Sequence, residues 1–414
     1  MRMTAFMILG VVFAVPTTSA GELPDRDIPS AGSPFEDNLT GDWGGTRTEW
    51  LNRGALVEAV NASDAFVSLK GGASRGSSVA NLFEVALTAD LGALAGLRGG
   101  TLFVLGFGAH GEDPSEAVGT IHSPGGLAED EPIWTLAEFW YEQSLFRDRA
   151  GLLVGFYAVD SEFDVRETAD AFVNDGFGAG LELSETGRNV DSVFALGGLG
   201  IRGRWAVTPD FDLRVGVVEG IPGKLDDPSA LGLELDADEG VLAIAEAEWR
   251  PAGFEFLRVA VGGWHYSTDF ERLDGGPEAD GTEGVYGFVE GVIFNEPGTD
   301  DQGLSGFVRI GRADESVNPF AAYHAAGLVY TGLLPGREED LLGLGVSSVA
   351  NGDDFTDAEP DPLDRRETVF ELTYRAQLLP WLGVQPTLQY ARNPGTDPEL
   401  DDNLSAGVRV TIDF

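Results

Sequence analysis

The residues of this sequence that could bind a ligand are charged and aromatic side chains that alternate with other residues along extended segments. Glu138, Trp140 and Glu142 occupy every second position of one segment, and Arg258 and Trp264 share a parity in another. Successive side chains of a β-strand point to opposite faces, so each set lies on one face. Charged groups exchange hydrogen bonds with hydroxyl groups, and indoles offer flat stacking surfaces. The pattern predicts an inward polar face on which these side chains line a lumen.

The same parity argument adds five residues on three other expected strands. The full set of predicted lining residues is Glu138, Trp140, Glu142, Arg202, Arg204, Arg258, Trp264, Arg309, Glu371 and Arg375. The alternative is that these side chains only set the field and the solubility of a polar face.

Enzymatic motifs do not emerge from the sequence. The four histidines, at 110, 122, 265 and 324, show neither HExxH spacing nor a recognisable Ser-His-acid pattern. The segment 198–203 fits GxGxxG but falls within an expected strand, whereas a nucleotide site needs it between a strand and a helix. Cysteine is absent, which excludes disulfides and thiolate chemistry. We therefore expect no enzyme; a membrane-barrel hydrolase is the alternative to test.

The net charge of the chain limits the classes of molecule that it can bind. With 26 basic and 69 acidic residues the net charge is −43, which argues against nucleic-acid binding. No cofactor is expected. The carboxylates of Asp353, Asp354, Asp357, Asp361 and Asp364 could gather calcium, although EF-hand spacing is absent.

The elements that must position these residues are β-strands. The last eleven residues, 404–414, alternate apolar and polar side chains, end on Phe414, and are long enough to cross a bilayer as a tilted strand. Sixteen such segments are predicted, at 55–70, 79–91, 99–110, 133–146, 150–159, 193–205, 211–219, 240–250, 255–267, 283–293, 304–313, 323–332, 339–349, 367–379, 382–392 and 404–414.

The connections between these strands are expected to alternate strictly between long and short, as in an up-and-down barrel with external loops and tight periplasmic turns. More than half of the acidic residues lie in six long connections. The fold predicted is all-β, a transmembrane antiparallel barrel of sixteen strands. A barrel of that size retains an aqueous channel, and the even strand number places both termini in the periplasm.

The longest connection, 160–192, is the candidate constriction. Folded into the lumen, it would bring its charged residues against the wall arginines; left outside, it is one more acidic loop. These charged residues are Asp160, Glu162, Asp164, Arg166 and Arg188.

The amino terminus resembles an export signal. Residues 1–20 combine a basic start, an apolar stretch and a small-residue cleavage site. Residues 21–54 are expected to form a periplasmic leader and a short helix, 47–53, and residues 55–414 the barrel. Thr46 and Glu49 fit a capping box and Gly54 suits the C′ position. Trp43, Trp50 and Leu51 are expected to pack this helix against the rim.

Several blocks resemble the OprB-like carbohydrate-selective porins. They are Asp42-Trp43-Gly44-Gly45 with Arg47; Glu138 to Gln143 running into Gly155; Asp160 to Asp164; Pro380-Trp381-Leu382; Gln385-Pro386; Gln389-Tyr390; Asn393-Pro394-Gly395; and the terminal Phe414. The remainder of 160–192 departs from the family pattern, which leaves the sugar preference open.

The resemblance implies an outer-membrane channel that admits mono- and oligosaccharides by diffusion. The alternative is a general or cation-preferring porin, because acidic residues at the mouth attract cations; a structural barrel with a plugged lumen is a further alternative. Expected partners are outer-membrane lipid, lipopolysaccharide and small carbohydrates. Porins of this size often pack as trimers, so a homotrimer is one expected assembly.

Overall fold

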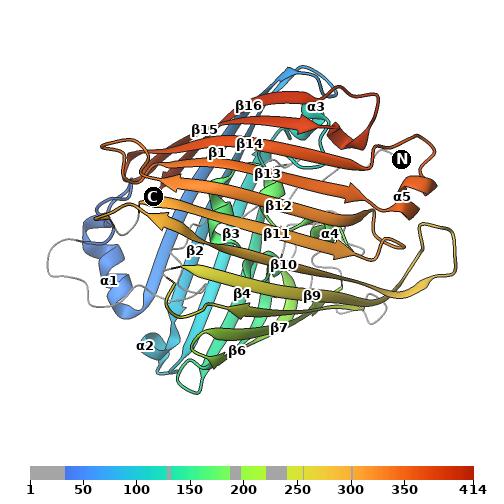
Figure 1. Cartoon of the computed structure of the whole chain (residues 1–414). Helices are drawn as coiled ribbons and strands as arrows, with labels where there is room; N and C mark the ends of the chain where they lie inside the picture. Colours follow the sequence, from blue (N-terminus) through green and yellow to red (C-terminus); the bar gives the residue numbers. More distant parts are fainter. Residues whose placement is uncertain (1–32, 128–131, 187–196, 221–239, 255, 300–301) are drawn as a thin grey trace.

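The computed structural model describes residues 33–127, 132–186, 197–220, 240–254, 256–299 and 302–414. Its strands form one closed antiparallel barrel, in which each strand pairs with its neighbours in sequence and β1 pairs with β16 (Figure 1). The predicted sixteen-stranded up-and-down barrel is confirmed.

The strand bounds follow the predicted segments closely. They are β1 (Ala55–Lys70), β2 (Ser77–Asp90), β3 (Gly100–Gly111), β4 (Ile133–Leu145), β5 (Ala150–Tyr157), β6 (Gly198–Thr208), β7 (Phe211–Glu219), β8 (Val241–Trp249), β9 (Leu257–Phe270), β10 (Ala279–Asn295), β11 (Gly303–Ala313), β12 (Phe320–Thr331), β13 (Leu341–Asn351), β14 (Arg366–Leu379), β15 (Leu382–Arg392) and β16 (Asn403–Asp413). Only β1, β7 and β15 match to the residue. Most of the predicted start of β6, 193–196, lies outside the described residues.

Alternation of burial along the strands shows which face looks outward. In β8, Leu242, Ile244 and Glu246 are buried, whereas Val241 and Trp249 are exposed. Lipid cannot hydrogen-bond the backbone, so a membrane-spanning sheet must close on itself and cover its outer wall with apolar side chains. The exposed Val, Leu, Ile and Trp side chains of this wall meet that requirement.

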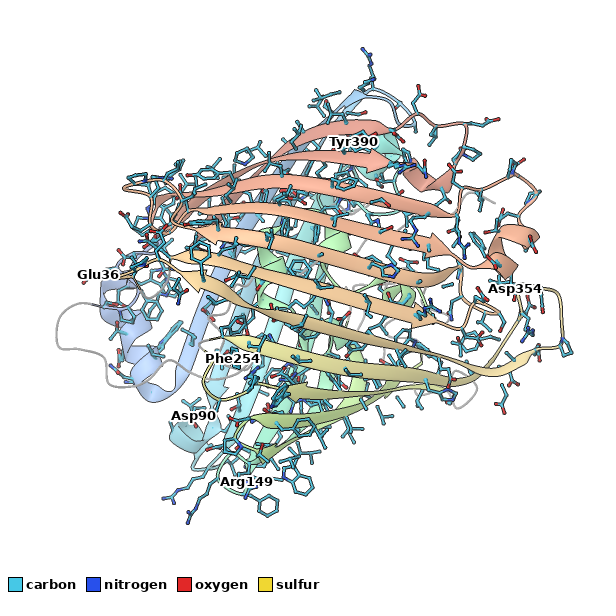
Figure 2. All side chains as sticks on the ribbon, viewed as in Figure 1. Glu36, Asp90, Arg149, Phe254, Asp354 and Tyr390 are labelled. Carbon is cyan, nitrogen blue, oxygen red and sulfur yellow. The ribbon has the colours of Figure 1, made fainter. Side chains whose placement is uncertain are left out.

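The two ends of the barrel differ in their connections. In Figure 2, Glu36 lies at the end that carries α1 (Thr46–Arg53), and Asp354 lies at the opposite end. The prediction that long and short connections alternate strictly is wrong. At the end opposite α1, the connections 71–76, 271–278 and 314–319 are each shorter than 332–340 at the α1 end. Three of the connections expected to be long are therefore short.

The helical segments are short. The other α-helices are α2 (Leu91–Ala95), α3 (Ser115–Val118), α4 (Leu181–Ser184) and α5 (Asp353–Ala358), and the 3-10 turns are η1 (Trp43–Gly45), η2 (Val159–Ser161), η3 (Glu167–Ala171), η4 (Asp175–Phe177) and η6 (Pro394–Thr396). None of the helices in the described ranges has the length and apolar character needed to cross a bilayer.

The start of α1 differs from the prediction. Gly45, with φ of +97°, is its N-cap, so Thr46 is the first helical residue and the capping box is wrong. Asp42 takes the capping role instead, because its carboxylate accepts from the Thr48 backbone N–H (2.8 Å). Gly54, with φ of +100°, ends the helix as predicted.

Arg47, rather than tryptophan, ties this segment to the barrel. Its guanidinium donates to the carbonyls of Phe414 (2.8 Å) and Val57 (3.0 Å), at the seam between β16 and β1. It also lies 4.1 Å from the centre of the Phe35 ring. Leu51 is buried as expected, but Trp43 and Trp50 are exposed and contact each other edge to face.

Candidate functional site

The connection after β5 turns into the barrel and spans it. Its Glu162 pairs with Arg202 of β6, and the backbone N–H groups of Val173 and Asn174 donate to Glu371 of β14. In a sixteen-stranded ring, β6 and β14 lie on opposite walls. The part of this connection from residue 158 to 186, called the lumen loop below, therefore crosses the channel.

Aromatic packing fixes the middle of the lumen loop. Phe172 and Phe177 stack with ring centres 4.3 Å apart, and both meet the Phe307 ring of β11 edge to face. Phe163 and Leu183 are fully buried in a separate cluster that includes Trp140 and Trp264. An inward apolar surface on β11–β13 thus serves as the seat of the loop, since burying it there removes it from water.

Three arginines of the wall hold the charged first half of the loop. Arg202 of β6 pairs with Glu162 of the loop (Nε to Oε2, 2.8 Å) and with Glu142 of β4 (3.2 Å). Glu162 and Arg202 are both buried. Charge-assisted bonds of this kind are shorter and stronger than neutral ones, so they fix the loop against β4 and β6.

Arg309 of β11 forms the most deeply buried contact. Its Nη2 donates to Asp164 Oδ2 at 2.8 Å, and its Nη1 lies 2.6 Å from Glu182 Oε1. Asp164 also pairs with Arg166, and its own backbone N–H donates to Glu246 of β8 (2.9 Å). Asp164 adopts φ of +58°, the left-handed conformation that Asp tolerates better than most residues. The chain therefore reverses at this ion pair.

Arg258 of β9 connects the loop to two neighbouring strands. It bonds Glu290 of β10 and Glu248 of β8 (both 2.9 Å) and Glu167 of the loop (3.1 Å). Glu290 in turn accepts from the Thr168 backbone N–H (2.8 Å). One buried guanidinium thus organises three carboxylates around the loop.

The opposite wall holds the loop with one carboxylate and two amides. Glu371 accepts from two loop N–H groups at 2.9 Å each, and Gln385 Nε2 donates to the Ala171 carbonyl (2.9 Å). Gln389 Oε1 accepts from the Asn174 side chain (3.0 Å). Three of these bonds are made by the loop backbone, and the fourth joins two side-chain amides.

A second inward segment, 119–127, lies beside the lumen loop. Glu367 of β14 accepts from the His122 ring (Nδ1 to Oε1, 2.9 Å) and from the Ile121 N–H (2.8 Å). Arg409 of β16 pairs with Asp64 of β1 (2.7 Å) and donates to the Gly125 carbonyl. Two connections therefore narrow the channel together.

A cavity of about 590 Å³ lies between the lumen loop and the end of the barrel that carries α1. Apolar lining comes from Leu56, Leu127, Phe172 and Phe177. Its polar lining residues include Asp37, Asn38, Arg47, Glu58, Asp160, Asp170, Asn174, Asp175, Arg375, Gln377, Gln385, Arg409, Thr411 and Asp413.

The predicted lining residues separate into those that hold the lumen loop, those that are buried by packing, and those that line the cavity or lie elsewhere on the wall. Arg202, Arg258, Arg309, Glu142 and Glu371 contact the lumen loop or its partners, as described above. Trp140 is 2% exposed, stacks on Phe103 (4.9 Å) and donates to Glu138 (2.9 Å). Trp264, 3% exposed, stacks on Tyr286.

Arg375 is the wall residue of the predicted set that lines the cavity, and Asp160 joins it from the loop. Arg204 shares the parity of Arg202 and is half-buried. Arg188 lies outside the described residues.

Burial alters the protonation of the lumen loop. Desolvation raises the pKa of Asp160 to about 8 and that of Glu182 to about 7, the latter despite its pairing with Arg309. Burial also raises the pKa of Asp175 well above its usual value. Neutral carboxyl groups are therefore common in the loop at pH 7, and each can donate a hydrogen bond.

Residues that the prediction missed are mostly the acceptors. Glu246, Glu290 and Gln385 contact the loop, and each lies on the inward face of its strand. The alternation pattern could have identified Glu246 and Gln385, because both lie on the polar face of their segments. Glu290 shares its face with Tyr286 and Phe288, and all three are buried because the loop fills that side of the lumen.

Among the described residues, no three His, Asp or Glu side chains are grouped so as to hold a metal ion. The calcium hypothesis stays a prediction.

Comparison with known proteins agrees with this geometry. Porin B of Pseudomonas aeruginosa is 24% identical to the chain, and the match covers 98% of this chain and 97% of that protein. The high-pH structure of Pseudomonas putida OprB superposes with a TM-score of 0.83 at 22% identity, covering 91% of this chain and 98% of the other. The low-pH structure of the same protein gives a TM-score of 0.60 at 19% identity, covering 93% and 100%.

A family model described as the carbohydrate-selective porin, OprB family, matches residues 74–414. Porins are channels, and their barrels are integral to the outer membrane. The chain belongs to the OprB family of carbohydrate-selective outer-membrane porins.

Proposed function

We propose that the channel passes small neutral sugars by passive diffusion, and that the lumen loop sets the size and polarity of what passes. The observation that carries this is the span of the loop from β6 to β14, which leaves a narrowed path lined by paired charges and amides. Pore diameter, hydrogen-bonding groups and electrostatic barriers are the determinants of selectivity in such channels.

Neutral solutes fit the charge arrangement best. At the constriction the arginines are matched by carboxylates within ion-pair distance, for example Arg309 with Asp164 and Glu182. Paired charges offer donors and acceptors to hydroxyl groups without a strong net field. Acidic connections at the outer mouth disfavour anions.

The test is single-channel conductance in planar bilayers, titrated with glucose, maltose and gluconate. Saturable reduction of current by glucose, weaker with gluconate, is the expected result. Current that is unchanged by any sugar would contradict the proposal. Conductance of the wild-type channel in the absence of sugar controls for insertion.

A second candidate is a general or cation-preferring porin. The net charge of −43 favours it, because an acidic mouth concentrates cations. Reversal potentials in a salt gradient separate the two: strong cation selectivity with no response to sugar supports the second candidate.

The surroundings of the barrel form part of the proposal. The apolar outer wall contacts lipid and lipopolysaccharide, and a homotrimer is the proposed assembly. Residues 1–20 act as a cleaved export signal, ahead of a periplasmic leader that ends at Gly54. Cross-linking in membranes and mass of the mature chain test these points.

A further inference from the structure

The cavity below the lumen loop carries charged side chains that form no direct hydrogen bond or ion pair with the described residues, although opposite charges lie near them. Within the described ranges, Arg375 of β14 makes no hydrogen bond or ion pair, although Asp170 and Asp413 lie close enough to act on it electrostatically. Glu58 of β1 lines the same space and likewise forms no hydrogen bond to the described residues. This contrasts with Arg202, Arg258 and Arg309, each of which contacts at least two carboxylates.

A second observation comes from the roof of the cavity. Both carboxyl oxygens of Asp175 and one of Asp160 are buried without a hydrogen-bond partner in the described structure. Both residues line the cavity. Buried polar groups left without partners are costly, and such groups often mark the place of a ligand or water.

The shape and chemistry of the cavity fit a pyranose. Ligand sites usually enclose about 300–1,000 Å³, and this one encloses about 590 Å³. Its guanidinium and amides can donate to hydroxyl oxygens, and its carboxylates can accept from hydroxyl groups. Phe172 and Phe177 supply an apolar surface for the ring carbons. Arginines and carboxyl groups both line the space, so it offers donors and acceptors together, as the hydroxyl groups of a neutral sugar require.

We propose that this cavity is a second binding site for neutral sugar, in series with the constriction, with Arg375 as hydrogen-bond donor and Glu58, Asp170 and Asp413 as acceptors. The inference rests on the proposed function. A solute that has passed the lumen loop would bind here before it leaves into the periplasm, and release from this site would be a separate step.

The experiment compares wild type, R375Q and R392Q in planar bilayers, with D-glucose as probe and current noise as the measure of binding. Arg392 is exposed, at the outer end of β15, and serves as the matched control. We expect R375Q to weaken glucose binding about tenfold, as for loss of a charged hydrogen bond, and R392Q to leave it unchanged. E58Q and D413N are expected to weaken binding less.

The outcomes separate the two proposals. If wild type shows no glucose-dependent noise, the proposed function fails and this site fails with it. If wild type binds glucose and R375Q binds it equally well, the second site is overturned while the function stands. R375K keeps a charged donor, so glucose binding that is recovered in R375K but not in R375Q supports the donor role of residue 375. Block of wild type by Mg²⁺ but not by glucose would assign the cavity to cations and overturn the proposal.

Discussion

The two walls of the barrel hold the same loop in different ways. On β6–β11 the contacts are ion pairs between buried arginines and carboxylates, as at Arg202, Arg258 and Arg309. On β14 and β15 they are hydrogen bonds between Glu371 or Gln385 and the loop backbone. The arginines of the first wall position the loop, whereas Arg375 of the second wall lines the cavity.

The order of residues in the loop explains the difference. Its first part is acidic, with Asp160, Glu162, Asp164 and Glu167, and it lies against the arginines. The part from 171 to 177 is rich in apolar side chains, so its backbone carries the polar contacts. Charge in the loop therefore determines which wall is neutralised and which remains available to solute.

Breaking the strongest ion pair should have the largest effect. Replacing Arg309 by Met leaves Glu182 buried without its cation and leaves Asp164 with Arg166 alone. Removing one partner of a buried pair costs about 3–5 kcal/mol. We expect a lower free energy of unfolding and a larger conductance, because the loop leaves the lumen.

Urea unfolding in detergent and single-channel conductance measure the two effects. The double variant R309M/E182Q serves as the control, since it removes the carboxylate that pairs with Arg309 and should recover part of the loss. Unchanged conductance in R309M would show that aromatic packing alone holds the loop.

Raising the pH should also weaken the contacts between the lumen loop and this wall, by less than the R309M substitution does. The pKa of Asp160 is about 8 and that of Glu182 about 7 in the folded protein, both raised by burial above their values in a solvated loop. Both carboxyl groups therefore bind their protons more tightly when the loop is folded into the lumen. The stability that they contribute is present at low pH, decreases as pH rises from about 4, and is lost above about pH 8.

We expect loop opening, seen as extra conductance, to increase between pH 6 and pH 9. Asp160 lies near Asp164 and Glu138, so its titration also adds repulsion, whereas Glu182 keeps the attraction of Arg309 when it ionises. The variant D160N/E182Q should flatten the pH profile. An identical profile in this variant would assign the effect to other groups.

On the second wall, E371L removes the acceptor of two loop N–H groups. An unsatisfied buried donor costs about 1–3 kcal/mol. We expect more frequent current fluctuations but a smaller change in mean conductance than for R309M. E371Q keeps an acceptor oxygen and should lie between wild type and E371L; equal behaviour of E371Q and E371L would show that the charge matters instead.

Most of the fold could be predicted because alternation with period two directly reports strand faces. Parity placed Arg202, Arg309 and Glu371 inside before any contact was known. The sequence-based prediction failed where the conformation of a glycine sets a boundary, as at Gly45, whose positive φ moves the helix start by one residue. It also failed at β10, which begins earlier than predicted and includes Gly281 at φ of +92°.

The site was less predictable because its contacts join distant parts of the chain. Parity shows that Trp140 and Trp264 face inward, but not that packing buries both of them. The partner of Asp164 is 145 positions away, and several wall arginines were equally available to it. Apolar residues such as Phe172 gave no signal for their position, which depends on the inward surface of β11–β13.

The smallest expected effect on conductance concerns one neutral side chain. Gln385 Nε2 donates to the Ala171 carbonyl and to Thr373 Oγ1, both at 2.9 Å. Each neutral hydrogen bond contributes about 0.5–1.5 kcal/mol, so Q385A, which removes both, should lower the free energy of unfolding by at most about 3 kcal/mol and leave conductance nearly unchanged. Gln377, on the next strand, donates to the carbonyls of Leu379 and Pro380 at the rim, and Q377A is therefore the matched control. If Q385A opened the channel as widely as R309M, backbone contacts would hold the loop as firmly as ion pairs, and the proposed difference between the two walls would be wrong.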